Sequence, residues 1–181
     1  MSTIYLDNAA TTKVREEVVS VISSIIKKEY GNPSSTHSYG RSSKSLIESS
    51  RKEIADILNV KSSEIIFTSG GTEGDNMIIR NCVNNLGVSH IITTKIEHHA
   101  VTHTIDDLIR SNNIKVSYVK VSKSGHVDLN DLEEILKRSD EKSLVSLMHI
   151  NNEIGNITDI QLVSEICQKH NSLFHSDTVQ S

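Results

Sequence analysis

The sequence has 181 residues, of which 36% are hydrophobic and 23% charged, and its formal net charge is −4. This length and composition suit a folded globular protein that needs neither disulfides nor a structural metal, and they exclude a disordered chain. The negative charge and the lack of a Lys/Arg stripe argue against a nucleic-acid-binding protein. Because the first residues are polar and no apolar run has membrane-spanning length, we expect a cytoplasmic protein.

Two cysteines, Cys82 and Cys167, lie among apolar residues in helical patterns. Such positions favour two separate buried thiols over a disulfide. Neither cysteine has the charged surroundings that activate a nucleophilic thiol. The sequence therefore predicts no catalytic thiol at these positions.

Two amphipathic helices are predicted in the first third of the chain. In residues 15–30, apolar side chains recur three and four positions apart, with acidic residues first and basic residues last. The loop GNPSSTHSYG interrupts the pattern, and a second helix is predicted from about Gly40 to Leu58. The apolar face of this second helix includes Leu46, Ile47, Ile54, Ile57 and Leu58.

Short apolar strands separated by helical stretches follow. The predicted strands are EIIFT (64–68), HIITT (90–94), KVSYVKV (115–121), SLVSLMHI (143–150) and SLFH (172–175). Their starts are roughly 25 to 30 residues apart, as in βαβ units. We therefore predict an α/β fold, with a mostly parallel sheet, helices on both faces and an N-terminal helical segment. Since no covering helix follows the fifth strand, we expect a truncated product or part of a longer chain.

Ligands of such sheets bind beyond the carboxyl ends of the strands, so the residues there are candidates for a site. The first strand runs into SGGTEGDN, where Gly70 and Gly71 let the backbone approach a ligand and Thr72 begins a helix. The free N–H groups of that helix start indicate a phosphate site. Taken alone, the motif is equally compatible with an ordinary glycine-rich turn, and its spacing matches neither GxGxxG nor the P-loop.

The second strand runs into KIEHHAVTH, which gathers Glu97, His98, His99 and His103 at a helix start. His99 and His103 stand one turn apart, as zinc ligands can, but no third ligand has a matching spacing. We therefore expect no metal. The other interpretation is that His98 presents its flat ring to a planar ligand.

The fourth and fifth strands end in MHINNEIG and HSDTVQS. Asn151, Asn152 and Glu153 precede Gly155, and an asparagine at such a strand end can donate to a phenolate-like oxygen, although asparagine equally forms turns. Asp177 and Gln180 follow a buried strand, and a carboxylate at that depth needs a partner such as a pyridinium nitrogen. The four strand ends together suit a phosphorylated, planar heteroaromatic cofactor, and pyridoxal 5'-phosphate (PLP) is such a molecule.

These motifs resemble the cysteine desulfurases of the NifS/IscS type, which are fold-type I PLP enzymes related to class V aminotransferases. The likeness runs from Tyr5 through nearly the whole chain. It depends on six segments in the family's order and spacing: YLDNAATT, GNPSSTHSYG, FTSGGTEGDN, IEHHAV, MHINNEIG and HSDTVQ. The segments NNEIG and HSDTVQ favour the NifS/IscS group over the SufS-like group.

The resemblance implies a role for each candidate residue. Gly71 and Thr72 would hold the phosphate, and His98 would stack on the pyridine ring as the catalytic residue among them. Asp177 would pair with the ring nitrogen. Two amide side chains would hydrogen-bond the ring hydroxyl oxygen, those of Asn152 and Gln180.

The resemblance also implies a domain organisation. Residues 1–14 would form an arm that contributes to the small domain and the active-site entrance, with residues 8–12 and His37 near that entrance. Residues 15–181 would form an incomplete PLP-binding large domain.

The implied reaction converts L-cysteine to L-alanine and leaves the sulfur as an enzyme persulfide, for iron–sulfur cluster assembly or tRNA thiolation. It requires a lysine that binds PLP covalently, a persulfide-forming cysteine and a substrate-binding arginine, and none has a match in this sequence. Lys169 and Cys167 lie in the wrong context. We therefore expect the 181 residues alone to be inactive. The implied partners are L-cysteine, a sulfur-acceptor protein such as an iron–sulfur scaffold, and a second copy in a homodimer, with no nucleic acid or membrane.

Two other hypotheses remain open. A nucleotide-binding α/β protein would carry an acidic residue at the end of the second strand to hold a ribose, but Lys95 occupies that region and the glycine spacing differs. A non-catalytic remnant or split half would act as an interaction module through the helices near Arg15 and Gly40. Adding the missing segment in trans would distinguish a split enzyme from a remnant.

Overall fold

The computed structural model describes residues 3–112 and 114–181 and divides the chain into two units, Met1–Phe67 and Thr68–Ser181. The predicted boundary after residue 14 concerns the family's domain organisation and stays a prediction. No helix in the described part of the chain combines the length and the apolar character needed to cross a membrane.

The first unit consists of helices α1 (Glu16–Lys28) and α2 (Ser38–Leu58) and the short 3-10 helix η1 (Ser62–Glu64). Both predicted long helices are confirmed to within two residues at each end. Acidic residues open α1 and lysines close it, so its charges complement the helix dipole. At the start of α2, His37 Nδ1 accepts a hydrogen bond from Gly40 N at 3.3 Å.

Little of this first unit is buried. No residue of α1 is buried, and α2 buries only Gly40, Ser43 and Ala55. The apolar residues of α1 are therefore exposed on the helix surface, including Val18, Val21, Ile22 and Ile26.

The strand predicted at residues 64–68 is wrong. Residues 62–64 form η1, and the following residues are extended but pair with no strand among the described residues. Ile66 and Phe67 are 65% and 48% exposed. A strand needs a neighbour for its backbone hydrogen bonds, so an apolar run alone does not make one.

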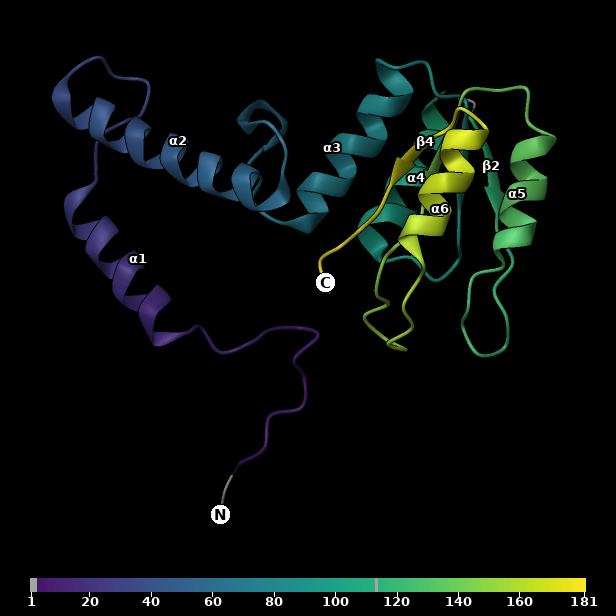
Figure 1. The fold of residues 1–181 in the computed structure, drawn as a ribbon, viewed down its shortest axis with the longest axis horizontal. Coiled ribbons are helices and arrows are strands. Elements are labelled where there is room, and N and C mark those ends of the chain that lie inside the picture. The colour runs from purple at the N-terminus through teal and green to yellow at the C-terminus, as the bar shows by residue number, and fades with distance from the viewer. Residues whose placement is uncertain (1–2, 113) are drawn as a thin grey trace. The chain divides into compact units, whose positions relative to one another are not determined.

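The second unit contains a parallel sheet with helices on both faces (Figure 1), which confirms the predicted fold class. Its strands are β1 (His90–Thr93), β2 (Lys115–Tyr118), β3 (Ser143–Ser146) and β4 (Leu173–His175). Its helices are α3 (Gly71–Asn84), α4 (His99–Asn112), α5 (Leu129–Lys137) and α6 (Ile160–Lys169). The four strands lie in the order β2-β1-β3-β4, and each neighbouring pair is parallel.

Alternation along the strands divides the core into two clusters. Ile91 and Leu144 pair across β1 and β3 and pack with residues of α3 and α4. Ile92 and Val145 pair one position further along and pack with residues of α5 and α6 on the opposite face. Successive strand residues point to opposite faces, so one short apolar run supplies both clusters.

The strand order reverses at β1. The chain leaves β1 through α4 to reach β2, and then returns through α5 to β3 on the other side of β1. In open α/β sheets the crevice at such a reversal, beyond the carboxyl ends of the strands, is where ligands bind. The carboxyl ends of β1 and β3 therefore mark the first place to look for a site.

Candidate functional site

The amino end of α3 forms one wall of the candidate site. The helix begins at Gly71 after an extended Gly70, and its second residue is the exposed Thr72. The first N–H groups of an α-helix have no partner within the helix and favour an anion. Glu73 turns back, and its Oε2 accepts a hydrogen bond from Ser69 N at 2.6 Å. Hydrogen bonds from Ser69 lower the pKa of Glu73.

The segment after β4 passes close to this helix start. A Cβ atom on Gly71 would lie only 2.5 Å from Cγ2 of Val179, so glycine permits the approach. Asp177 is 8% exposed, and its Oδ1 accepts a hydrogen bond from Val179 N at 3.0 Å. Its backbone oxygen accepts one from His149 N at 3.0 Å, which ties it to the chain after β3.

His98 stands at the start of α4 with an exposed side chain. Its backbone oxygen accepts hydrogen bonds from Val101 N and Thr102 N at 2.9 and 3.1 Å, as at a helix N-cap. Its Nδ1 accepts from Ala100 N at 3.2 Å. Since Nδ1 is an acceptor here, the proton of the neutral ring is on Nε2. The local backbone therefore sets both the orientation and the tautomer of the imidazole.

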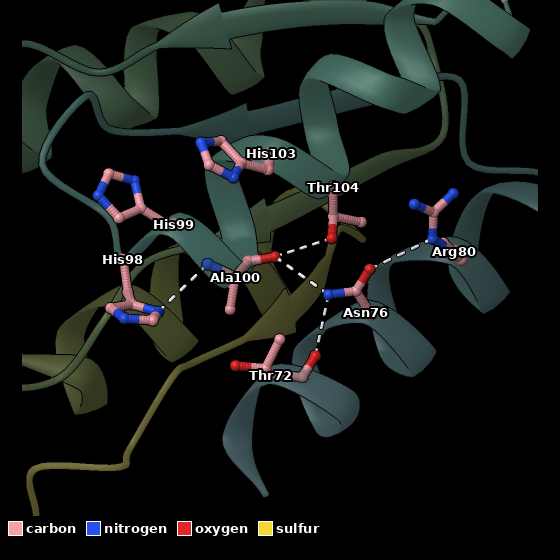
Figure 2. A pocket seen from close by; sticks show the side chains of 8 residues that line it. All are labelled: Thr72, Asn76, Arg80, His98, His99, Ala100, His103 and Thr104. Carbon is pink, nitrogen blue, oxygen red and sulfur yellow. Dashed lines mark hydrogen bonds between the residues drawn. The ribbon is translucent and has the colours of Figure 1, made fainter.

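Thr72 and His98 line the same cavity, of about 250 Å³, between α3 and α4 (Figure 2). Asn76 bridges the two helices, since its Nδ2 donates to Thr72 O at 2.9 Å and to Ala100 O at 3.4 Å. Further along, Nη1 of Arg80 lies 2.7 Å from Oδ2 of Asp107. The remaining lining residues are His99, Ala100, His103 and Thr104.

His99 and His103 stack on the surface of α4, with ring centroids 4.9 Å apart and an angle of 22° between the rings. A metal site in a protein normally needs at least three side-chain ligands. Within residues 3–112 and 114–181, no group of three or more His, Cys, Asp or Glu residues could hold a metal ion.

Glu97 is buried below His98 and accepts two hydrogen bonds. Thr94 Oγ1 donates to its Oε1 at 2.7 Å, and Met148 N donates to its Oε2 at 2.9 Å. Burial raises the pKa of Glu97 to about 7, with smaller contributions from the nearby carboxylates of Asp177 and Asp75. The carboxyl ends of β1 and β3 are thus joined by a single side chain.

A second buried pair links α3 to the sheet. His175, the last residue of β4, has Nε2 3.3 Å from Oδ1 of Asp75 on α3. Its Nδ1 lies 2.9 Å from the hydroxyl of Ser146 on β3. Both contacts of the His175 ring are buried. They therefore fix helix α3, which carries Thr72, relative to strand β4, which precedes Asp177.

The structure brings four of the predicted site residues to one rim of the second unit: Gly71, Thr72, His98 and Asp177. Asn152 is half-buried in the turn after β3, where its neighbour Asn151 donates through Nδ2 to Ile96 O at 2.9 Å. Gln180 is half-buried in the segment after β4. What these six residues bind stays a prediction.

Sequence reasoning gave no role to Asp75 or His175, and it considered Glu97 only as part of a histidine cluster. A weak signal existed in each case. Asp75 lies one helical turn after the predicted phosphate residues, and His175 ends an otherwise apolar strand. A polar residue in a buried strand or on a buried helix face requires a partner, but the sequence does not identify that partner.

Comparison with known proteins identifies the family of this chain. The aminotransferase class-V family matches residues 4–181. A cysteine desulfurase IscS of Dictyoglomus turgidum is 43% identical over 180 residues, which cover 98% of this chain and 45% of that protein. A mitosomal cysteine desulfurase of Trachipleistophora hominis is 39% identical over 182 residues, covering 98% of this chain and 41% of that protein.

Solved structures show the same fold. A NifS-like protein superposes with a TM-score of 0.91 at 39% identity, covering 98% of this chain and 49% of its own. SspA in complex with cysteine gives a TM-score of 0.90 at 31% identity, covering 99% of this chain and 51% of its own. This chain spans about half the length of the relatives it matches. It belongs to the aminotransferase class-V family, and its relatives there are cysteine desulfurases of the IscS/NifS type.

Proposed function

We propose that this chain forms the cofactor cradle of a PLP-dependent cysteine desulfurase, which converts L-cysteine to L-alanine and retains the sulfur as a persulfide. One observation carries the proposal: Thr72, His98 and Asp177 lie far apart in the sequence but at one rim of the sheet. This rim lies where the strand order reverses, as expected of a ligand site. The names of the relatives support the choice of substrate.

The side chains at this rim offer the chemical groups that PLP would require. The start of α3 at Gly71 and Thr72 offers backbone N–H groups and a hydroxyl to a phosphate. The exposed imidazole of His98 can lie on the face of a ring, and the amides of Asn152 and Gln180 can donate to a ring hydroxyl oxygen.

Asp177 is the residue proposed to control the protonation of the cofactor ring nitrogen. When bound, PLP supplies an electron sink, whose strength depends on a protonated ring nitrogen. The buried carboxylate of Asp177 would hold that proton at the nitrogen, and the ring cation would in turn give the carboxylate the partner that its burial requires.

The two thiols of this chain are unsuited to carry the persulfide. Cys82 and Cys167 are 6% and 1% exposed. Burial raises the pKa of Cys82, and it raises that of Cys167 to about 12, so both remain protonated at neutral pH. Lys169 is paired on the surface with Glu133 at 2.6 Å. The reaction therefore needs a lysine and a thiolate other than these, and we expect the 181 residues alone not to turn over cysteine.

The proposed partners follow from the proposed reaction. They are L-cysteine, a sulfur acceptor such as an iron–sulfur scaffold protein or the tRNA thiolation machinery, and a second copy of the complete polypeptide in a homodimer. The expected cytoplasmic location stays a prediction, because one relative is mitosomal.

The proposal is tested by titrating the purified chain with PLP and following the absorbance of the cofactor. Asp177→Ala should weaken binding by about tenfold or more, because it removes the carboxylate proposed to pair with the ring nitrogen. Asp140→Ala, which removes an exposed carboxylate after α5, is the matched control and should leave affinity unchanged. Addition of L-cysteine should yield no alanine. Equal affinity in both variants, or alanine formed at enzymatic rates, would contradict the proposal.

A second candidate function is an interaction module that performs no chemistry. The exposed apolar surface of α1 favours it, because large exposed apolar surfaces mark places of interaction. The two functions are separated by adding, in trans, the part of a relative that lies beyond the region matched by this chain. Recovered turnover of cysteine supports the split enzyme, whereas failure to associate favours the module.

A further inference from the structure

Glu97 is a buried carboxylate that the proposed reaction does not use. It is 8% exposed and precedes His98 directly. The transfer of a carboxylate from water into a protein interior is unfavourable unless hydrogen bonds replace those to water. An apolar side chain would fill the same space at no such cost, so the hydrogen bonds made by Glu97 are the place to look for its role.

Those hydrogen bonds cross the reversal point of the sheet. Thr94, one residue after β1, donates to Oε1 at 2.7 Å, and Met148, two residues after β3, donates through its backbone N–H to Oε2 at 2.9 Å. All three residues are buried. A carboxyl group has lone pairs on both oxygens and, when protonated, can donate to the Thr94 hydroxyl, so it can bond both partners in either protonation state.

The hydrogen bonds of Glu97 connect on both sides to residues of the candidate site. On one side, Glu97 is adjacent to His98, whose ring is itself fixed by the hydrogen bond from Ala100 N (Figure 2). On the other side, Met148 is adjacent to His149, whose N–H donates to the backbone oxygen of Asp177 at 3.0 Å. Glu97 therefore connects the loop of the imidazole to the end of β3, and the backbone of His149 connects the end of β3 to Asp177 after β4.

A second contact supports the same loop. Asn151 donates through Nδ2 to Ile96 O at 2.9 Å, and its Oδ1 accepts from Glu153 N and Ile154 N at 2.9 and 3.0 Å. The backbone before His98 is thus held from the β3 side at two consecutive residues. The Glu97 side chain bonds residues just beyond the ends of both β1 and β3, Thr94 and Met148. On the β1 side, the Asn151 side chain bonds only the backbone of Ile96.

We propose that Glu97 is a positioning residue, whose carboxyl group fixes the loop carrying His98 to the end of β3 and thereby orients the imidazole toward the rim that Asp177 shares. The inference depends on the proposed function only for the identity of the ligand. The position of the loop can be measured without any ligand.

Three variants test the two hydrogen bonds of the Glu97 side chain. Glu97→Ala removes both acceptors, whereas Glu97→Gln keeps an oxygen for Met148 N–H and offers its NH₂ group to the Thr94 hydroxyl, which can accept. Thr94→Val removes one of the two donors and keeps the other. The matched control is Asp131→Ala, since Asp131 also accepts from a backbone N–H and a side chain, both of Lys120, at 2.9 and 2.7 Å.

The first measurement is made on the ligand-free protein by NMR. In Glu97→Ala, hydrogen exchange of the Met148 amide should accelerate about tenfold or more, and the imidazole signals of His98 should shift. Glu97→Gln and Asp131→Ala should leave both close to the wild type. Thr94→Val should shift the His98 signals and retain Met148 protection, which keeps the test decisive even if Glu97→Ala does not fold.

The second measurement is PLP affinity in a double-mutant cycle. Glu97→Ala and His98→Ala should each weaken PLP binding by about tenfold, and the double variant should be no weaker than either single one, because Glu97 acts through His98. Additive losses would mean that Glu97 only supports the fold, and would overturn the proposal. Unchanged His98 signals in both Glu97→Ala and Thr94→Val would overturn it as well. If the wild type fails to bind PLP, the proposed cofactor is wrong, while the NMR measurement still decides the role of Glu97.

Discussion

The two units of this chain use similar helices but bury them to different degrees. In the second unit, Leu132 of α5 is fully buried in a core cluster. In the first unit, α1 has the same kind of amphipathic pattern, yet Ile26 is 73% exposed and no residue of the helix is buried. The pattern specifies a helix in both cases. Burial also requires a complementary surface, which the sheet provides only in the second unit.

The largest expected effect is a difference between two truncations of a large apolar side chain. Leu132→Ala should lower the free energy of unfolding by about 2–5 kcal/mol, because it leaves a cavity against the sheet. Ile26→Ala, its counterpart in α1, should change it by no more than about 0.5 kcal/mol. Urea denaturation followed by circular dichroism measures both. A loss of more than about 2 kcal/mol in Ile26→Ala would show that the α1 surface is covered in solution, and the contrast between the units would fail.

The same contrast explains how far the sequence could predict the fold. Periodicity identified both long helices, and it identified the four strands that have neighbours in the sheet. It failed at residues 64–68, where Ile66 and Phe67 form an apolar run without a strand to pair with. Strand formation depends on a partner from elsewhere in the chain, which a local pattern does not encode.

Prediction of the site had a similar limit. The rule that ligands bind at the carboxyl ends of strands selected His98 and Asp177, since it needs only the position of each strand. The pairing of Asp75 with His175 joins residues 100 positions apart through the packing of α3 on the sheet. No spacing within either motif indicates it, so it emerged only from the structure.

The two units also differ in the ionisable side chains that they bury. The second unit buries the carboxyl groups of Asp75, Glu97 and Asp177, whereas the described residues of the first bury no charged side chain. The pKa of Glu97 is raised from 4.5 to about 7. Between these values the unfolded chain loses the proton and the folded protein keeps it, so the stability of the fold decreases as the pH rises from about 4.5 to about 7 and then stays level.

Glu97→Gln removes this dependence while keeping both hydrogen bonds. Relative to the variant, the wild type should lose up to about 3 kcal/mol of stability between pH 4.5 and pH 8, the upper limit that the raised pKa allows. Urea denaturation at a series of pH values measures the two curves. Glu165→Gln, an exposed carboxylate on α6, should follow the wild type. If the Glu97→Gln and wild-type curves remain parallel, Glu97 is ionised in the folded protein across this range.

The smallest expected effect concerns the N-caps of two helices, α5 in the second unit and α1 in the first. In the second unit, Asp128 caps α5 by accepting hydrogen bonds from Asn130 N and Asp131 N, both at 3.1 Å. In the first, Arg15 precedes α1 and makes no side-chain cap. Arg15→Ser would supply the missing acceptor and should stabilise α1 by about 0.5–1 kcal/mol.

That gain should remain within α1. Amide exchange in residues 16–28 should slow, while the urea midpoint of the second unit should not move, because the cores in that unit contain no residue of α1. Ala10→Ser, which adds a hydroxyl outside the helix, serves as the control. If Arg15→Ser also raised the midpoint of the second unit, the two units would unfold as one cooperative body, and the exposed surface of α1 would then have to be explained within that body.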